Sequence, residues 1–273
     1  MLTKVEVRTE TGDLLTLNLD NSDTGLLVKD IQGLDPVKAT MVSTSFARVA
    51  GSQYQSSKRE ERNIKFQFGL EPDYVDVIDV RQLRDELYAY FNPTSEVKMR
   101  FFETGLTVEA VGRVETCENN RFAQEPQVDV SVICNNPDFY ALSPVVDSGN
   151  TTAGGTQNNV QYDGTVDAGA IFTLNVDRSI SEFTIYHTLP SGDLRQLDFA
   201  ASLVAGDVLE ISTVTGSKYA TLTRGGVKSS VLYGIPQQSA WLEFKNGLNK
   251  IRWYATGAAI PYTITYTNLY GAL

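Results

Sequence analysis

Histidine is almost absent from this chain of 273 residues, with His187 as its only copy. Ser-His-Asp triads, Cys-His dyads and histidine-rich metal sites therefore have almost no residues to work with. His187 follows Ile185 and Tyr186 in an alternating stretch, which favours a satisfied structural histidine over a general base. The sequence predicts no catalytic residue and no enzymatic activity.

Cysteine is nearly as scarce. Cys117 and Cys134 are too few for a disulfide framework, and their spacing does not match a zinc site. We interpret them as two small buried hydrophobic side chains in a reducing compartment. The alternating acids of a calcium loop do not occur, and neither Gly-Gly pair is followed by the Lys-Ser or Lys-Thr of a phosphate loop. We therefore expect no metal and no cofactor.

Long hydrophobic runs are also missing. Residues 1–8 alternate between polar and apolar and carry charges where a signal peptide has its apolar region. The longest uncharged stretch, 253–273, is interrupted by Gly257 and Pro261 and alternates in the manner of a strand. These patterns predict a protein that is made and used in solution, without a membrane partner.

Basic residues are in deficit, 23 against 33 acidic ones. Residues 1–145 hold 23 acidic and 15 basic side chains, a net charge of −8, whereas residues 146–273 hold 10 and 8, a net charge of −2. A negative surface repels phosphate backbones, so nucleic-acid binding is disfavoured as the main task. The same repulsion suits a surface that nucleic acid slides past.

Alternation with a period of two dominates the first half of the chain. It predicts strands at residues 2–8, 13–19, 25–34, 38–49, 62–70, 97–103, 106–115 and 127–134. The polar stretch 50–62 predicts an exposed, mobile loop or a long hairpin arm.

One segment has a helical period instead. Apolar residues recur at spacings of three and four from Asp76 to Phe91, namely at Val77, Val80, Leu83, Leu87 and Phe91. Asp73 or Asp76 is suited to cap the start, and Asn92-Pro93 ends the pattern. The sequence predicts a single helix at 76–91 whose apolar stripe packs against a sheet.

Residues 147–159 contain no large apolar side chain, and we interpret them as a linker or the entry loop of a second domain. Roughly eight to ten short alternating runs follow, separated by Gly, Asn, Asp or Pro. The chain is therefore predicted to be mainly β, with two domains. Residues 1–145 would form a β-barrel or sandwich with one helix, and residues 146–273 a β-sandwich or jelly roll.

Two tryptophans lie in this second half. Trp241 shares a strand face with Glu243, while Leu242 and Phe244 share the other, so Trp241 is predicted to be the more exposed ring. An exposed tryptophan can stack on a sugar, which makes Trp241 the candidate carbohydrate contact. Trp253 is predicted to lie in the core.

Several segments, taken in order, carry a resemblance. They are Asp30-Ile-Gln-Gly-Leu-Asp-Pro, Lys58-Arg-Glu-Glu-Arg-Asn-Ile-Lys-Phe-Gln-Phe, the helix before Asn92-Pro93, Cys134-Asn-Asn-Pro-Asp-Phe-Tyr, Gly206-Asp-Val-Leu-Glu-Ile-Ser-Thr and Phe244-Lys-Asn-Gly-Leu-Asn-Lys-Ile. Over essentially its full length the chain resembles the distal tail proteins of siphophages. Residues 147–168 are a loose version of that family's opening Asn-x-Gly segment, and no extra sugar-binding insertion is visible.

The resemblance implies a virion protein of the phage tail tip, assembled in the host cytoplasm as a hexameric ring. Residues 1–145 would line the channel and stack on the tail tube protein, and DNA would pass without specific binding. The C-terminal domain would be a galectin-like or carbohydrate-module-like jelly roll. It would hold tail-tip hub, tail fibre or receptor-binding proteins.

Two other functions stay open from the residues. One is a carbohydrate-binding adhesion module for the host surface, which needs an exposed aromatic platform such as Trp241. The other is a tail-associated enzyme that degrades polysaccharide, which needs two convergent carboxylates in a groove.

Overall fold

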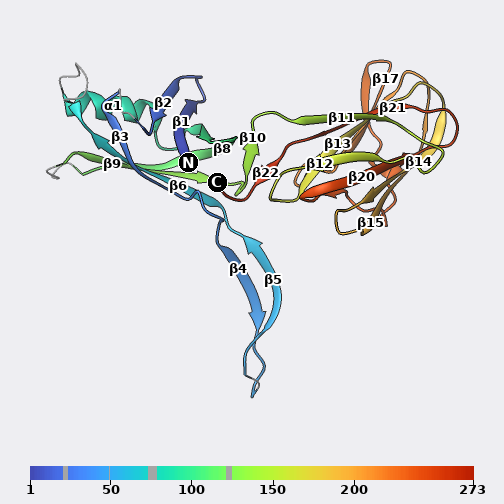
Figure 1. Cartoon of the computed structure of the whole chain (residues 1–273), viewed down its shortest axis with the longest axis horizontal. Coiled ribbons are helices and arrows are strands. Elements are labelled where there is room, and N and C mark those ends of the chain that lie inside the picture. Colours follow the sequence, from blue (N-terminus) through green and yellow to red (C-terminus); the bar gives the residue numbers. More distant parts are fainter. Residues whose placement is uncertain (21–23, 49, 73–78, 121–124) are drawn as a thin grey trace. The chain divides into compact units, whose positions relative to one another are not determined.

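The computed structural model describes residues 1–20, 24–48, 50–72, 79–120 and 125–273. The chain divides into two compact units, residues 1–142 with 270–273, and residues 143–269 (Figure 1). The predicted boundary between residues 145 and 146 lies three residues from this division, and independent folding of the halves stays a prediction. The last four residues belong to the first unit, which no pattern in the sequence indicated.

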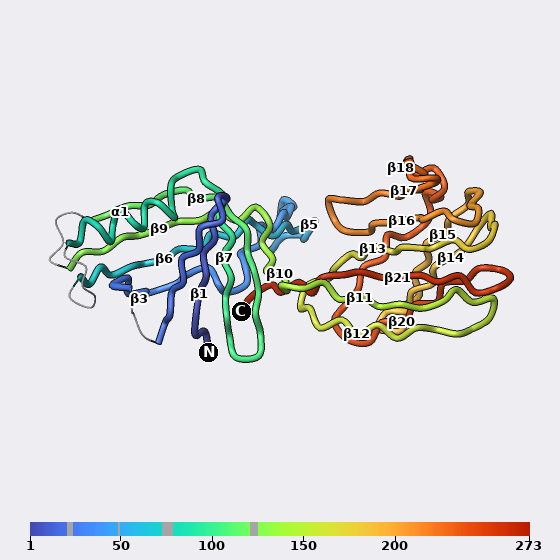
Figure 2. The backbone as a smooth tube through the Cα atoms, turned by 90° about the horizontal axis from the view of Figure 1, so that it is seen from above, coloured from blue at the N-terminus to red at the C-terminus, as the bar shows by residue number. Residues whose placement is uncertain are grey.

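The first unit is built on one antiparallel sheet in the order β2-β1-β7-β8-β9-β6-β3. All of these strands except β2 are labelled in Figure 2. Its strands are β1 (Leu2–Thr9), β2 (Leu14–Asn18), β3 (Leu26–Gln32), β6 (Arg62–Leu70), β7 (Glu96–Glu103), β8 (Leu106–Asn119) and β9 (Gln127–Cys134). The short strand β10 (Phe139–Ala141) pairs with β8 and with β22 (Leu269–Tyr270). β4 (Ala39–Thr44) and β5 (Gln53–Arg59) form a separate hairpin.

The helix α1 spans Val80–Tyr90. Residues 76–78 of the predicted helix, and the predicted caps Asp73 and Asp76, lie outside the described residues. The described helix is capped by Asp79, whose carboxylate accepts a hydrogen bond of 3.1 Å from the backbone N–H of Arg81. It ends where Phe91 donates its N–H to the carbonyl of Leu87.

The apolar stripe of α1 packs on the sheet as predicted. Leu83, Leu87 and Phe91 are buried in the core of the first unit. The Phe91 ring centre lies 6.0 Å from that of Phe66 and 5.8 Å from that of Phe68. Both of these rings come from the inner face of β6, since side chains two residues apart on a strand point the same way.

Replacing Leu83 with alanine is expected to lower the free energy of unfolding by about 3 kcal/mol through the cavity left under the helix. Urea denaturation of the purified chain measures the loss. Arg81→Ala on the same helix is the matched control, because its side chain is 73% exposed. A loss of less than about 0.5 kcal/mol for Leu83→Ala would contradict the packing.

The second unit is a sandwich of two antiparallel sheets. The larger sheet runs β11 (Val145–Asn150), β21 (Pro261–Tyr266), β13 (Ala168–Asn175), β16 (Val208–Ser212), β17 (Tyr219–Arg224), β18 (Val227–Ser230), with β19 (Glu243–Phe244) on β13. The smaller sheet runs β12 (Asn158–Tyr162), β20 (Gly247–Tyr254), β14 (Ile180–Thr188), β15 (Leu194–Leu203). A 3-10 turn, η2, spans Leu232–Gly234.

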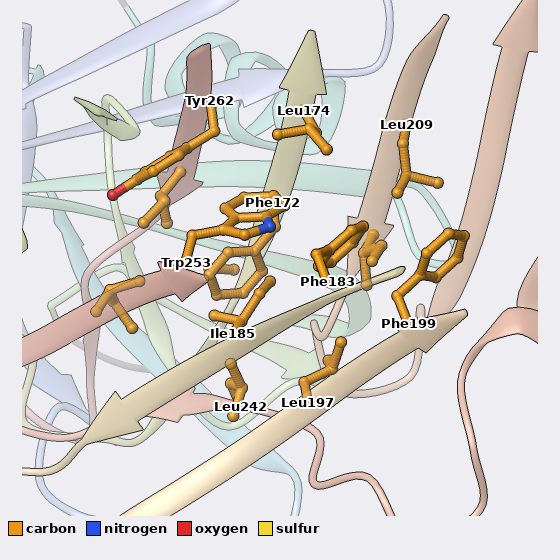
Figure 3. Packing of buried hydrophobic residues seen from close by; sticks show 14 of the residues in the cluster. Phe172, Leu174, Phe183, Ile185, Leu197, Phe199, Leu209, Leu242, Trp253 and Tyr262 are labelled. Carbon is orange, nitrogen blue, oxygen red and sulfur yellow. The ribbon is translucent and has the colours of Figure 1, made fainter. Parts of the chain in front are cut away.

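Aromatic side chains from both sheets fill the space between them (Figure 3). Trp253 of β20 is 1% exposed, which confirms its predicted place in the core. Its ring centre lies 4.8 Å from that of Tyr262 on β21 and 5.3 Å from that of Phe183 on β14. Phe172 of β13 meets the same indole edge-on at 6.1 Å. One continuous core therefore joins the two sheets.

Of the two interpretations of residues 147–159, the linker is wrong, whereas residues 151–157 do form a loop at the start of the second unit, between β11 and β12. Asp147 to Asn150 belong to β11, which pairs with β21 from Val145 to Asn150, and β12 begins at Asn158. At Gly149 the small residue has a packing reason, because a Cβ added there would lie 2.6 Å from the hydroxyl oxygen of Tyr262. A composition that is typical of linkers here marks a strand in close contact with an aromatic neighbour.

Candidate functional site

The β4–β5 hairpin is an arm whose side chains have almost no cover from their own unit. Every residue of β5 is exposed, and so is every residue of β4 except Ala39. The strands pair antiparallel from Ala39 opposite Arg59 to Thr44 opposite Gln53. In Figure 1 the arm extends away from the sheet of the first unit. Of the two predictions for residues 50–62, a mobile loop or a long hairpin arm, the hairpin arm is the one observed. Its second strand, β5, begins at Gln53.

The arm carries large apolar side chains in solvent. Met41 is 71% exposed, and Val42, Phe46 and Tyr54 are exposed as well. An isolated two-stranded hairpin is at best marginally stable in water. Exposed apolar groups gathered on one element mark a surface that another molecule covers. The arm therefore has the properties of an assembly element.

The base of the arm is held firmly to the first unit. Glu60 donates its N–H to the carbonyl of Lys38 at 3.0 Å, which closes the hairpin at its root. Arg59 forms an ion pair with the Asp138 carboxylate, and Asp138 is itself held by the side chain of Asn136. These contacts fix the point from which the arm leaves the sheet.

Arg62, three residues beyond the arm, is a buried cation that is 1% exposed. Its guanidinium donates to the carbonyls of Pro137 at 2.7 Å, Asp35 at 2.9 Å and Gly271 at 2.6 Å, and also to that of Gly33. It lies 4.2 Å from the ring centre of Phe139. Burial lowers the pKa of Arg62, with Cys134 and Asp138 opposing that effect.

Arg62 thereby joins segments that are distant in the sequence. It holds the turn after β3, the segment before β10 and the C-terminal tail together at the root of the arm. The sequence placed this arginine in a family-like strand but did not indicate its partners, since all of them are backbone carbonyls.

An acidic groove of about 350 Å³ lies on the sheet of the first unit. Among the described residues, its lining includes the carboxylates Asp30, Glu115 and Asp129 and the cation Lys65. Ser131 Oγ lies 2.8 Å from the carboxylate of Glu115, next to a register shift between β8 and β9. Part of the negative charge of residues 1–145 therefore lies in a groove on the sheet.

His187 is buried in the second unit, and its Nε2 lies 3.0 Å from the Asn249 side-chain oxygen. Its ring meets Phe244 edge-on at 5.4 Å. It is structural, as predicted, but only half satisfied, because its Nδ1 has no hydrogen-bond partner. Burial lowers the pKa of His187, and the bond to Asn249 opposes this effect.

We expect the second unit to lose stability as the pH falls below 6.5, the ordinary histidine pKa. The unfolded chain then binds a proton that the folded chain, with its depressed pKa, does not bind, so the free energy of unfolding rises with pH in this window. The slope reaches at most about 1.4 kcal/mol per pH unit. Urea denaturation between pH 7.5 and 5.5 measures it. The variant His187→Gln removes the only histidine, so an unchanged slope in that variant would refute the assignment.

Trp241, the candidate carbohydrate contact, is half-buried and packs against the core of the second unit. Leu242 and Phe244 on the opposite side are buried, as the alternation predicted. The ammonium of Lys218 lies 5.5 Å from the centre of the Trp241 ring. A sugar that stacked on this face would first displace Lys218, and the contact stays a prediction.

Both cysteines are free thiols, Cys134 buried and Cys117 half-buried. Burial raises the pKa of each to about 11, so neither is a ready nucleophile. Within the described ranges, no three His, Cys, Asp or Glu side chains gather in a group that could hold a metal ion. The described helices include none with the length and apolar character needed to cross a membrane.

Both units are β-rich, and the first carries the exposed β4–β5 arm. Residues 13–137 match the model of the phage tail protein RIFT-related domain, and residues 163–270 match that of the siphovirus-type tail component, C-terminal domain. The chain belongs to the siphophage distal tail proteins. It is a structural component of the virion at the tail tip. No curated protein matches its sequence.

One solved structure shares the fold. The crystal structure of the Dit protein of phage SPP1, described as a hub of the adsorption apparatus in phages that infect Gram-positive bacteria, has a TM-score of 0.67 and 17% identity over 97% of this chain and 98% of that one. A chain of the phage p2 baseplate in its activated conformation with Sr has a TM-score of 0.46 and 9% identity, covering 96% of this chain and 97% of that one. A chain of the same baseplate with Ca has a TM-score of 0.48 and 9% identity, covering 100% of both chains.

Proposed function

We propose that the chain forms a closed hexameric ring at the distal end of the tail, which joins the tail tube to the tail tip and lets DNA pass. The observation that carries this proposal is the β4–β5 arm. Its apolar side chains are largely exposed to solvent, yet its root is anchored by Arg59 and Arg62. A rigidly rooted arm with a bare apolar surface suits a neighbouring copy of the same chain.

Closed symmetry explains how such an arm is tolerated. In a ring each copy gives one arm and receives one, so every apolar surface is covered and none remains to grow a fibre. The sheet of the first unit also ends in two edge strands, β2 and β3. Unpaired edges of this kind favour pairing with another chain, and a ring gives each edge a partner of fixed geometry.

Charge supports the assignment of residues 1–145 to the channel. This half has a net charge of −8, against −2 for residues 146–273, and its sheet bears the acidic groove. Each basic contact to a phosphate would add affinity and slow release. A net negative wall therefore lets DNA pass without binding it, while the second unit holds tail-tip hub, tail fibre or receptor-binding proteins.

An electron-microscopy reconstruction of the tail tip tests the proposal. We expect a sixfold ring whose channel wall is built from residues 1–145, stacked on the tail tube. A lone copy of the chain would overturn the proposal. So would a ring whose channel is formed by residues 160–273 and lined with lysine and arginine.

The arm itself is tested by the triple variant Met41→Ser, Phe46→Ser and Tyr54→Ser. Tail assembly in a complementation assay should be lost, while thermal unfolding of the isolated chain stays unchanged because these side chains are exposed. The matched control replaces exposed apolar residues of the second unit, Leu194→Ser and Val227→Ser, and should still assemble tails. Normal tail assembly with the triple variant would show that the arm is not the contact between copies.

A further inference from the structure

Two cavities of the second unit meet at Asp198 on the outer side of the smaller sheet. One, of about 190 Å³, is lined by Thr184, Tyr254 and Glu182 among others. The other, of about 430 Å³, is lined by residues of β15 and by Gln238 and Ala240. Asp198 lines both. The strand register explains the meeting, because Thr184 of β14 pairs with Asp198 of β15 on one side and with Tyr254 of β20 on the other.

The Asp198 carboxylate is held in place before any ligand arrives. Its Oδ1 accepts hydrogen bonds of 2.7 Å from the Thr184 hydroxyl and from the Gln196 amide, and its Oδ2 accepts one of 2.9 Å from the same amide. Its backbone N–H donates to Ser239 Oγ at 3.0 Å. A carboxylate has about four lone-pair sites, so capacity remains to accept a ligand hydroxyl.

Aromatic rings adjoin this polar centre. Tyr254 lines the smaller cavity. Tyr186 lies on the neighbouring strand β14, two residues after Thr184, which is the cross-strand partner of Tyr254. The Arg252 guanidinium lies 4.1 Å from the ring centre of Tyr186 and 6.0 Å from that of Tyr254. Such contacts stabilise the rings by cation–π attraction. The Tyr254 ring therefore borders the smaller cavity and the Gln196 amide the larger one, with the fixed Asp198 carboxylate lining both.

We propose that this surface, defined by Thr184, Gln196, Asp198 and Tyr254, binds a neutral saccharide. A sugar ring offers hydroxyls to Asp198 and the amide of Gln196, and its C–H face stacks on Tyr254. The carboxylates Asp198 and Glu182 repel anionic ligands, while Arg252 and Arg195 nearby disfavour a small cation. An apolar ligand would leave the polar wall without partners. This site is distinct from Trp241, which lines neither cavity, and it adds a function to the proposed ring.

The test is a glycan array of bacterial surface oligosaccharides probed with the purified full-length chain, followed by calorimetric titration of the strongest binder. We expect at least one neutral glycan to bind. Asp198→Asn and Gln196→Ala should each weaken it about tenfold, the usual cost of a lost hydrogen bond in which one partner is charged. Tyr254→Ala should also weaken it. The controls are Gln161→Ala, exposed on β12 of the same sheet, and Trp241→Ala, and both should bind as the unaltered chain does.

Each other outcome overturns the site. The site is refuted if no neutral glycan on the array binds the chain. It is also refuted if Asp198→Asn and Gln196→Ala both bind the glycan as the unaltered chain does. If only Trp241→Ala lost binding, the sugar would be assigned to Trp241, the contact predicted from the sequence. Asp198→Asn and Gln196→Ala keep the buried core intact, so equal melting temperatures show that a loss of binding is not a loss of folding.

Discussion

Replacing Arg62 with methionine is expected to lower the free energy of unfolding of the first unit by about 3–5 kcal/mol. Methionine fills much of the same space but donates no hydrogen bond. The carbonyls of Gly33, Asp35, Pro137 and Gly271 would lose their donor, and each buried carbonyl without a partner costs about 1–3 kcal/mol. The C-terminal tail would also lose its hydrogen bond at Gly271, although the pairing of β22 with β10 would remain.

Chemical denaturation of the Arg62→Met chain measures this loss. Arg113→Met is the matched control, because that arginine is 58% exposed, and its ion pairs with Glu10 and Glu96 and its hydrogen bond to the Thr94 carbonyl lie at the surface, so its loss should cost less than about 1 kcal/mol. Arg62→Lys should recover a small part of the stability, since one ammonium cannot reach carbonyls on several sides as a guanidinium does. A cost below about 1 kcal/mol for Arg62→Met would show that the buried guanidinium is not what holds these segments together.

Trp253→Ala is expected to lower the free energy of unfolding of the second unit by about 3–5 kcal/mol. The indole is fully enclosed and contacts rings from both sheets, Phe172, Phe183 and Tyr262 among them (Figure 3). Its removal leaves a cavity between the sheets that rigid neighbouring strands cannot close. The second unit should therefore unfold at a much lower temperature, while the first unit changes little.

The other tryptophan is the control for this experiment. Trp241 is only partly covered, so Trp241→Ala should cost about 1 kcal/mol by loss of the smaller buried area. Differential scanning calorimetry compares the two variants without relying on tryptophan fluorescence. Equal costs would contradict the placement of Trp253 at the centre of the core.

Much of the fold follows from local patterns. Alternation predicted β9 at Gln127–Cys134 and most of the other strands to within a few residues, because one face of each strand is buried and side chains alternate between faces. The helical stripe predicted the contacts of Leu83 and Leu87 for the same reason. Composition misled at residues 147–150, which belong to β11, where a side chain at Gly149 would collide with Tyr262.

The sequence by itself determined the β-rich class, the amphipathic helix before Asn92, the uneven charge and the core position of Trp253, since each depends on residue type and local spacing. Only the tertiary structure decided which distant groups meet. Arg62 gathers carbonyls from three separate segments, and Thr184 meets Asp198 and Tyr254 across strand pairs. The register between strands brings such groups together, and it is set by the packing of the whole sheet, because a shift of one residue would turn every side chain to the opposite face.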